Sequence, residues 1–163
     1  MKYLAIGKSY RFLALSLFED LNNEVTLKEV RFIRFDDFNQ SNIFKKAYET
    51  VVNYLSENVV SVVVTHKLNT KKILKKEIQR ISEMRAIIQL ACAEKKVFVV
   101  EPKTDGWEAY ITKGRNTFAK KRDIVENGYD IDLSSICKNE DEYKVLVDTI
   151  VLGEALANKR LML

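Results

Sequence analysis

Proline, glycine and histidine are scarce in this chain. Its 163 residues include one proline, five glycines and one histidine, which excludes a collagen-like sequence. No apolar run approaches the ~18 residues of a membrane-spanning helix, and charges at Lys2 and Lys8 exclude a signal-peptide core at the N-terminus. Cys92 and Cys137 lie too far apart in the sequence to form a metal-binding pair, and two cysteines make no disulfide framework. We therefore expect a reduced, cytoplasmic protein with no membrane partner.

The residues that are present predict a folded protein with an uneven charge. Apolar residues make up 47% of the chain and charged residues 31%, which excludes intrinsic disorder. The length favours a single domain over residues 1–163. The net charge is +4, but the stretch 67–122 holds 15 lysines and arginines against 6 acidic residues, and the remainder is acidic. This basic stretch is typical either of a surface that binds an anionic partner or of a solvated helix face.

The hydrophobic pattern predicts five strands and several helices. Three strands joined by short turns, at 2–7, 11–18 and 24–35, predict an antiparallel meander. Two apolar runs rich in valine, at 59–65 and 97–101, predict buried parallel strands. Helices are expected at 42–57 with Ser41 as N-cap, at 70–95, 106–113 and 118–126, and at 140–159 with Asn139 as N-cap, and a loop is expected at 129–138. The expected fold class is α/β, a mixed sheet flanked by helices, in the element order of ribonuclease H-like folds.

Five segments, in their order and spacing, resemble RuvC-type Holliday junction resolvases. They are Tyr3–Gly7, Val62–His66 followed by Met84–Ile88, Val97–Pro102, Lys113–Arg115 with Lys121, and Asp148–Leu156. Together they cover most of the chain. The resemblance implies a ribonuclease H-like fold, DNA as partner, and a homodimer, since a two-fold junction suits a two-fold protein.

The acidic residues of the site depart from the family pattern. The resemblance implies four carboxylates that hold Mg²⁺ or Mn²⁺ for phosphodiester cleavage, at the positions of Gly7, His66, Val145 and Asp148. Only Asp148 is acidic. Because Mg²⁺ prefers several oxygen ligands, we expect a degenerate site, with Asp148 and His66 as the candidate catalytic residues and Asp148 as the metal ligand if a metal binds.

Both candidates also have an ordinary structural interpretation. His66 is the only histidine and lies at a strand end, so it either contacts a phosphate or metal, or forms a simple hydrogen bond. Asp148 is flanked by apolar residues, and burial without a partner would be costly. It either binds a metal or pairs with Lys144, four residues earlier.

The candidate DNA-binding residues lie in the basic stretch. The resemblance implies backbone contacts by Lys113, Arg115, Lys120, Lys121 and Arg122, and Lys71, Lys72 and Lys75 would extend the same surface. Trp107 and Phe118 lie between them in the sequence, and we expect both to be largely buried.

Three functions remain open from the sequence. The first is a protein that binds branched or duplex DNA through a basic groove, with weak or no cleavage. The second is an active Mg²⁺- or Mn²⁺-dependent junction-resolving endonuclease with relocated acidic ligands. The third is a protein-interaction module that kept only the fold.

Overall fold

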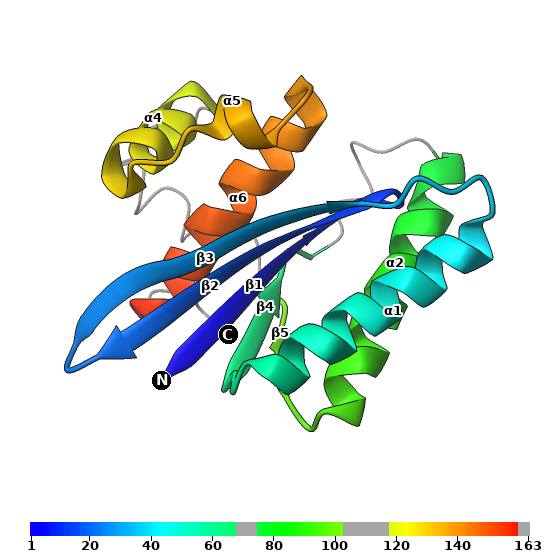
Figure 1. Cartoon of the computed structure of the whole chain (residues 1–163), viewed down its shortest axis with the longest axis horizontal. Helices are drawn as coiled ribbons and strands as arrows, with labels where there is room; N and C mark the ends of the chain where they lie inside the picture. The colour runs from blue at the N-terminus through cyan, green and yellow to red at the C-terminus, as the bar shows by residue number, and fades with distance from the viewer. Residues whose placement is uncertain (68–74, 103–117, 160–163) are drawn as a thin grey trace.

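A computed structural model describes residues 1–67, 75–102 and 118–159, and these residues form one mixed sheet covered by helices on both faces (Figure 1). The strands are β1 (Lys2–Lys8), β2 (Phe12–Leu21), β3 (Glu24–Arg34), β4 (Val62–Thr65) and β5 (Phe98–Val100). Their order across the sheet is β3-β2-β1-β4-β5. β1 to β3 are antiparallel, whereas β4 and β5 run parallel to β1. The predicted three-strand meander with two parallel strands is confirmed.

The helices divide between the two faces because side chains alternate along each strand. Leu4 and Ile6 of β1 point toward one hydrophobic cluster, and Tyr3 and Ala5 point toward the other. The first cluster lies beneath α1 and α2, and the second beneath α6, as Figure 1 shows. The helices are α1 (Gln40–Glu57), α2 (Lys75–Glu94), α4 (Phe118–Tyr129), α5 (Leu133–Ile136) and α6 (Glu140–Ala157).

Helix α6 is the most deeply buried helix and packs against β1 and β2. Leu146, Ile150 and Val151 are fully buried, and Ser16 Oγ of β2 donates a hydrogen bond of 3.2 Å to the carbonyl oxygen of Thr149. Of the helices that the structure describes, none has the length and apolar character needed to cross a membrane.

The start of α1 and the segment 129–138 differ from the sequence prediction. Helix α1 begins at Gln40, and its N-cap is Asn39, whose side chain accepts from the backbone N–H of Ser41. The prediction of Ser41 as cap was wrong because both residues are good N-caps and the local pattern does not separate them. The segment 129–138 contains the single turn α5, capped by Asp132, and the loop prediction was wrong there. The predicted helix at 106–113 lies outside the described residues.

Candidate nucleic-acid interface

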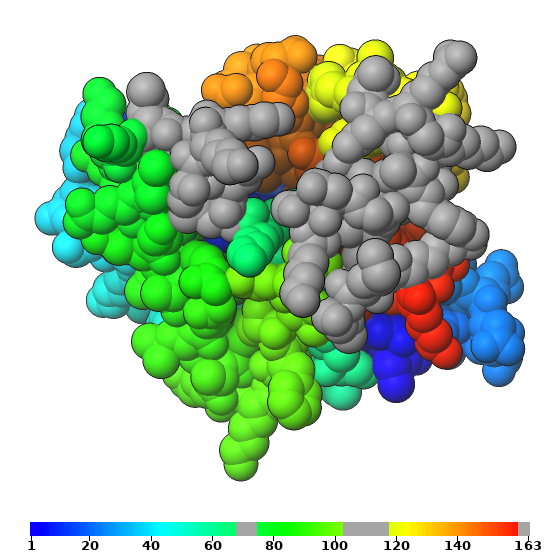
Figure 2. Space-filling model, turned by 180° about the vertical axis from the view of Figure 1, so that it is seen from behind, coloured from blue at the N-terminus to red at the C-terminus, as the bar shows by residue number. Residues whose placement is uncertain are grey.

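The candidate site lies where the carboxyl ends of β1 and β4 meet beneath α6. The parallel register pairs Ile6 with Thr65, so the next residues, Gly7 and His66, are neighbours at this edge of the sheet. Figure 2 shows a face of the molecule with α2 in green on one side and α4 and the start of α6, in yellow and orange, at the top. The topology therefore brings together the four positions at which the resemblance implies carboxylates.

Gly7 lies so close to α6 that no side chain fits there. A Cβ atom on Gly7 would overlap Thr149 Oγ1, and it would lie 2.9 Å from Val145 Cγ1 and 3.2 Å from Thr149 Cβ. Contacts below about 3 Å do not occur between carbon atoms in packed interiors. Helix α6 fills the space that an aspartate on β1 would need.

His66 binds a backbone group of α6. Its Nε2 atom lies 3.1 Å from the carbonyl oxygen of Asp148. Because a carbonyl oxygen only accepts hydrogen bonds, Nε2 carries the proton and donates it. This contact fixes the histidine ring against the helix and agrees with its structural interpretation as a hydrogen-bonded strand end.

The carboxylate of Asp148 pairs with a lysine from another helix. Lys121 Nζ of α4 donates to Asp148 Oδ1. The Lys121 side chain is 10% exposed and that of Asp148 is 32% exposed, so the ion pair lies partly inside the protein. The sequence offered Lys144 as the structural partner of Asp148, and the structure supplies Lys121 instead.

These residues do not fit a divalent metal ion. Among the four positions, the only carboxylate is Asp148, and an ammonium group lies on its oxygen. Within the described residues there is no cluster of three or more aspartate, glutamate, histidine or cysteine side chains that would hold a metal. Mg²⁺ requires several oxygen ligands in octahedral geometry, and this arrangement does not supply them.

A second cation lies on the opposite face of the same sheet edge. Lys8 Nζ donates to Thr65 Oγ1 at 2.9 Å and to the carbonyl oxygen of His66 at 2.6 Å. The pKa of Lys8 is lowered to about 8, mainly by burial; Glu101 acts in the opposite direction, and Arg85 contributes to the lowering. Arg85 and Glu101 form a bidentate ion pair of 2.5 and 2.7 Å between α2 and the end of β5. The sequence analysis did not single out Lys8 as a site residue, although its place next to Gly7 was a signal.

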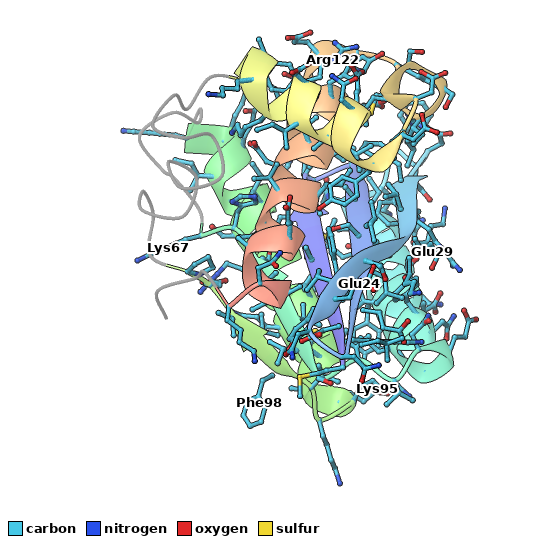
Figure 3. The ribbon with its side chains drawn as sticks, turned by 90° about the vertical axis from the view of Figure 1, so that its left-hand side faces the viewer. Glu24, Glu29, Lys67, Lys95, Phe98 and Arg122 are labelled. Atoms are coloured by element: carbon cyan, nitrogen blue, oxygen red, sulfur yellow. The ribbon has the colours of Figure 1, made fainter. Side chains whose placement is uncertain are left out.

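Of the other residues predicted to contact DNA, the structure describes Lys75, Lys120 and Arg122. Lys75 is exposed at the start of α2, and Lys120 is partly buried on α4. Arg122 pairs with Glu126 at 3.1 Å, and its guanidinium group lies 4.4 Å from the ring centroid of Tyr143. Figure 3 shows Arg122 at the α4 end of the molecule. Lys71, Lys72, Lys113 and Arg115 lie outside the described residues, as does Trp107. Phe118 is partly buried and packs against the core beneath α6.

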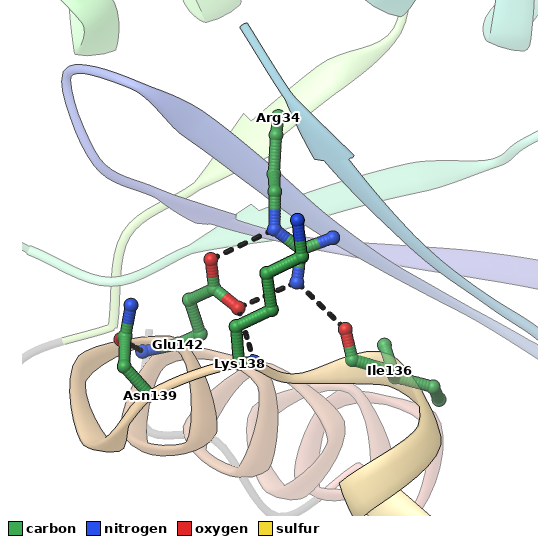
Figure 4. Close-up of polar contacts among 5 residues, drawn as sticks. All are labelled: Arg34, Ile136, Lys138, Asn139 and Glu142. Carbon is green, nitrogen blue, oxygen red and sulfur yellow. Dashed lines mark hydrogen bonds and ion pairs between the residues drawn. The ribbon is translucent and has the colours of Figure 1, made fainter. Parts of the chain in front are cut away.

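A partly buried ion pair that the sequence analysis missed holds the first turn of α6 to the sheet. Arg34 of β3 contacts Glu142 through two hydrogen bonds of 2.8 and 2.5 Å (Figure 4). It also donates to the carbonyl oxygen of Ile136 at 2.7 Å, and the backbone N–H of Lys138 donates to Glu142 at 2.7 Å. The hydrogen bonds from Arg34 lower the pKa of Glu142 below its ordinary value. No local pattern in the sequence links Glu142 to a residue 108 positions away.

Comparison with solved structures shows the fold of Holliday junction resolvases. RuvC of T. thermophilus in complex with Holliday junction substrate aligns with a TM-score of 0.73 at 10% identity, over 99% of this chain and 98% of that chain. The yeast mitochondrial Holliday junction resolvase Ydc2 aligns with a TM-score of 0.69 at 10% identity, over 97% of this chain and 78% of that one. The Fowlpox virus resolvase in complex with Holliday junction DNA aligns with a TM-score of 0.63 at 14% identity, over 98% of both chains.

The chain thus has a ribonuclease H-like fold of the RuvC type, and the resemblance inferred from the sequence is confirmed at the level of the fold. No family model and no curated protein matches this sequence.

Proposed function

We propose that this protein binds branched DNA without metal-dependent cleavage. The proposal is supported by the resolvase fold along almost the whole chain combined with a site in which the ammonium group of Lys121 lies on the remaining carboxylate. The proposed lack of cleavage rests on the contact between Lys121 and Asp148. Recognition would depend on the shape of the junction and on contacts to phosphates.

A homodimer is part of this proposal, and α2 offers a surface for it. Ala86, Leu90 and Ala93 are exposed and follow one another at intervals of four and three residues, which places them on one face of the helix. The Leu90 side chain is 58% exposed. Two copies of this stripe, related by a two-fold axis, would bury each other and present two DNA-binding surfaces to the arms of one junction.

Fluorescence anisotropy with a labelled four-way junction tests the binding. A linear duplex of the same total length is the matched control, and both are titrated in EDTA and in Mg²⁺, at about 50 and 200 mM salt. In EDTA, we expect the protein to bind the junction more tightly than the linear duplex. The affinity should fall by about a thousandfold between the two salt concentrations if some six phosphates are contacted. Absence of binding at the lower salt concentration would favour the protein-interaction module and overturn the proposal.

A cleavage assay on the same junction tests the missing activity. The wild type and Asp148→Asn are incubated with junction DNA in Mg²⁺ and in Mn²⁺, and the products are separated on a denaturing gel. We expect intact strands with both proteins. Cleavage by the wild type that disappears in Asp148→Asn would identify an active endonuclease and refute the proposed loss of activity.

A further inference from the structure

A cavity of about 880 Å³ adjoins the candidate site, with which it shares Lys8 and Val145. Its walls come from the β1–β2 turn, the β3–α1 loop and the first turns of α2 and α6. The volume lies in the range of cavities that hold organic ligands. The function proposed above assigns no role to it.

Two aromatic residues line this cavity from neighbouring loops. Tyr10 lies in the β1–β2 turn, and Phe38, in the β3–α1 loop, is fully exposed. The backbone N–H of Phe35 donates to the carbonyl oxygen of Arg11 at 2.9 Å, and Gln40 Nε2 donates to the carbonyl oxygen of Tyr10 at 3.1 Å. These bonds join the two loops into one wall, and the Phe38 side chain on it is fully exposed.

Two arginines accompany the tyrosine. The guanidinium groups of Arg11 and Arg80 each lie 5.5 Å from the ring centroid of Tyr10, and they come from the turn and from α2. Arginine planes and aromatic rings both stack on nucleobases, and each such stack contributes to the affinity for single-stranded nucleic acid.

The charges of the cavity favour bases over the phosphate backbone. Basic and acidic side chains line it together: Lys8, Arg11, Arg34 and Lys144 on one hand, and Asp36, Asp37, Glu77, Asp141 and Glu142 on the other. A row of phosphates requires a surface of positive charge, and these acids would repel it. Base edges carry both donors and acceptors, so walls of mixed charge suit them.

We propose that this cavity receives unpaired nucleobases from the branch point of a DNA junction, with Phe38 and Tyr10 as stacking surfaces. The inference rests on the proposed binding of branched DNA and adds a site for the exchanged bases to it. The phosphates on either side of such a base would lie toward Lys8 and the neighbouring strand ends.

Alanine variants of the two aromatic residues test the inference. Phe38→Ala and Tyr10→Ala are compared with the wild type on the four-way junction and on the linear duplex at one salt concentration. Phe98→Ala is the matched control, because Phe98 is also an exposed phenylalanine (80%) but lies on β5, which contributes no residue to the cavity wall; its side chain projects from the surface of the molecule (Figure 3). Since Phe38 is fully exposed, its removal leaves the core intact, and circular dichroism checks the fold.

The expected result is a selective loss. Phe38→Ala should weaken junction binding about fivefold or more, with duplex binding unchanged within about twofold, and Phe98→Ala should change neither. A 2-aminopurine base at the branch point should change its fluorescence on binding to the wild type, and this change should be lost in Phe38→Ala.

Two results would overturn the inference while leaving DNA binding established. One is junction binding by Phe38→Ala and Tyr10→Ala equal to the wild type, which would point to a protein partner for the exposed phenylalanine. The other is an equal loss on junction and duplex. A wild type that binds neither DNA would instead overturn the proposed function, and the inference would fall with it.

Discussion

Substitution of Gly7 by alanine tests whether helix α6 closes the space of the expected first-strand carboxylate. The added Cβ would overlap Thr149 Oγ1 and lie 2.9 Å from Val145 Cγ1. Thr149 is fully buried, and its hydroxyl donates to the carbonyl oxygen of Val145 at 2.6 Å. Because a β-branched residue in a helix has few rotamers, the threonine has little freedom to turn away.

The expected magnitude follows from two opposing effects. Replacement of glycine by alanine in a compatible conformation stabilises a protein by about 0.4–1 kcal/mol through the unfolded state. Overpacking of a tight interior costs about 1–3 kcal/mol. We expect Gly7→Ala to lower the free energy of unfolding by about 1–2 kcal/mol. In the background Thr149→Ala, which removes the overlapping hydroxyl, the same substitution should cost at least about 1 kcal/mol less.

Urea unfolding followed by circular dichroism measures all four proteins of this double-mutant cycle. Ala14→Gly serves as a control. It removes one buried methyl group from β2, at the position opposite Gly7, and so changes the same sheet edge by a single methyl group. A Gly7→Ala protein as stable as the wild type, or a cycle with no coupling, would refute the claim that α6 excludes a side chain. It would also reopen the possibility that an aspartate at this position restores metal binding.

Three further predictions concern charges and assembly. Glu142→Gln should lower the free energy of unfolding at neutral pH by about 2 kcal/mol, because it leaves Arg34 without its anionic partner. The pKa of Glu142 is lowered in the folded protein, so the ion pair stabilises the wild type above the ordinary pKa of 4.5, and this stabilisation is lost as the pH falls below that value. The acid unfolding curves of the wild type and the variant should therefore converge. Lys8→Met should remove a rise in wild-type stability between about pH 8 and 10.5, because in this range the unfolded chain binds the proton that folded Lys8 has lost, and thermal unfolding across these pH values measures it. Leu90→Glu should convert a dimer into a monomer in sedimentation velocity, and the control Val59→Glu, at an exposed valine (87%) outside α2, should stay dimeric.

The order of the strands and helices along the chain was predictable from the sequence, but strand ends were not. The run of valines at 59–65 predicted a long strand, whereas β4 covers only Val62–Thr65. The pairing of β4 with β1 begins at Val62, which lies opposite Tyr3 near the start of β1. Val59 is therefore exposed in spite of its high strand propensity. Pairing in the sheet, rather than local propensity, decides this boundary.

The charged contacts of the site could not be predicted from the sequence for a similar reason. The rule of neighbouring helical turns offered Lys144 as the partner of Asp148. The actual partner, Lys121, lies 27 residues away on α4, and only the packing of α4 against α6 brings it close. By contrast, Asn139 was correctly predicted as the cap of α6, because its bond to the backbone N–H of Glu142 is local. Local patterns therefore predicted the elements, and tertiary packing determined the chemistry between them.

The placement of the cations has a direct consequence for the proposed binding of DNA. A cluster of several carboxylates repels a phosphate until a metal ion neutralises it. Here the remaining carboxylate, Asp148, already has an ammonium counterion, and Lys8 adds positive charge at the same sheet edge. A phosphate can then approach this edge without any bridging metal. In the anisotropy assay Mg²⁺ should accordingly act only as a competing counterion and weaken junction binding relative to EDTA. Tighter binding in Mg²⁺ would show instead that a metal ion joins this site to the DNA.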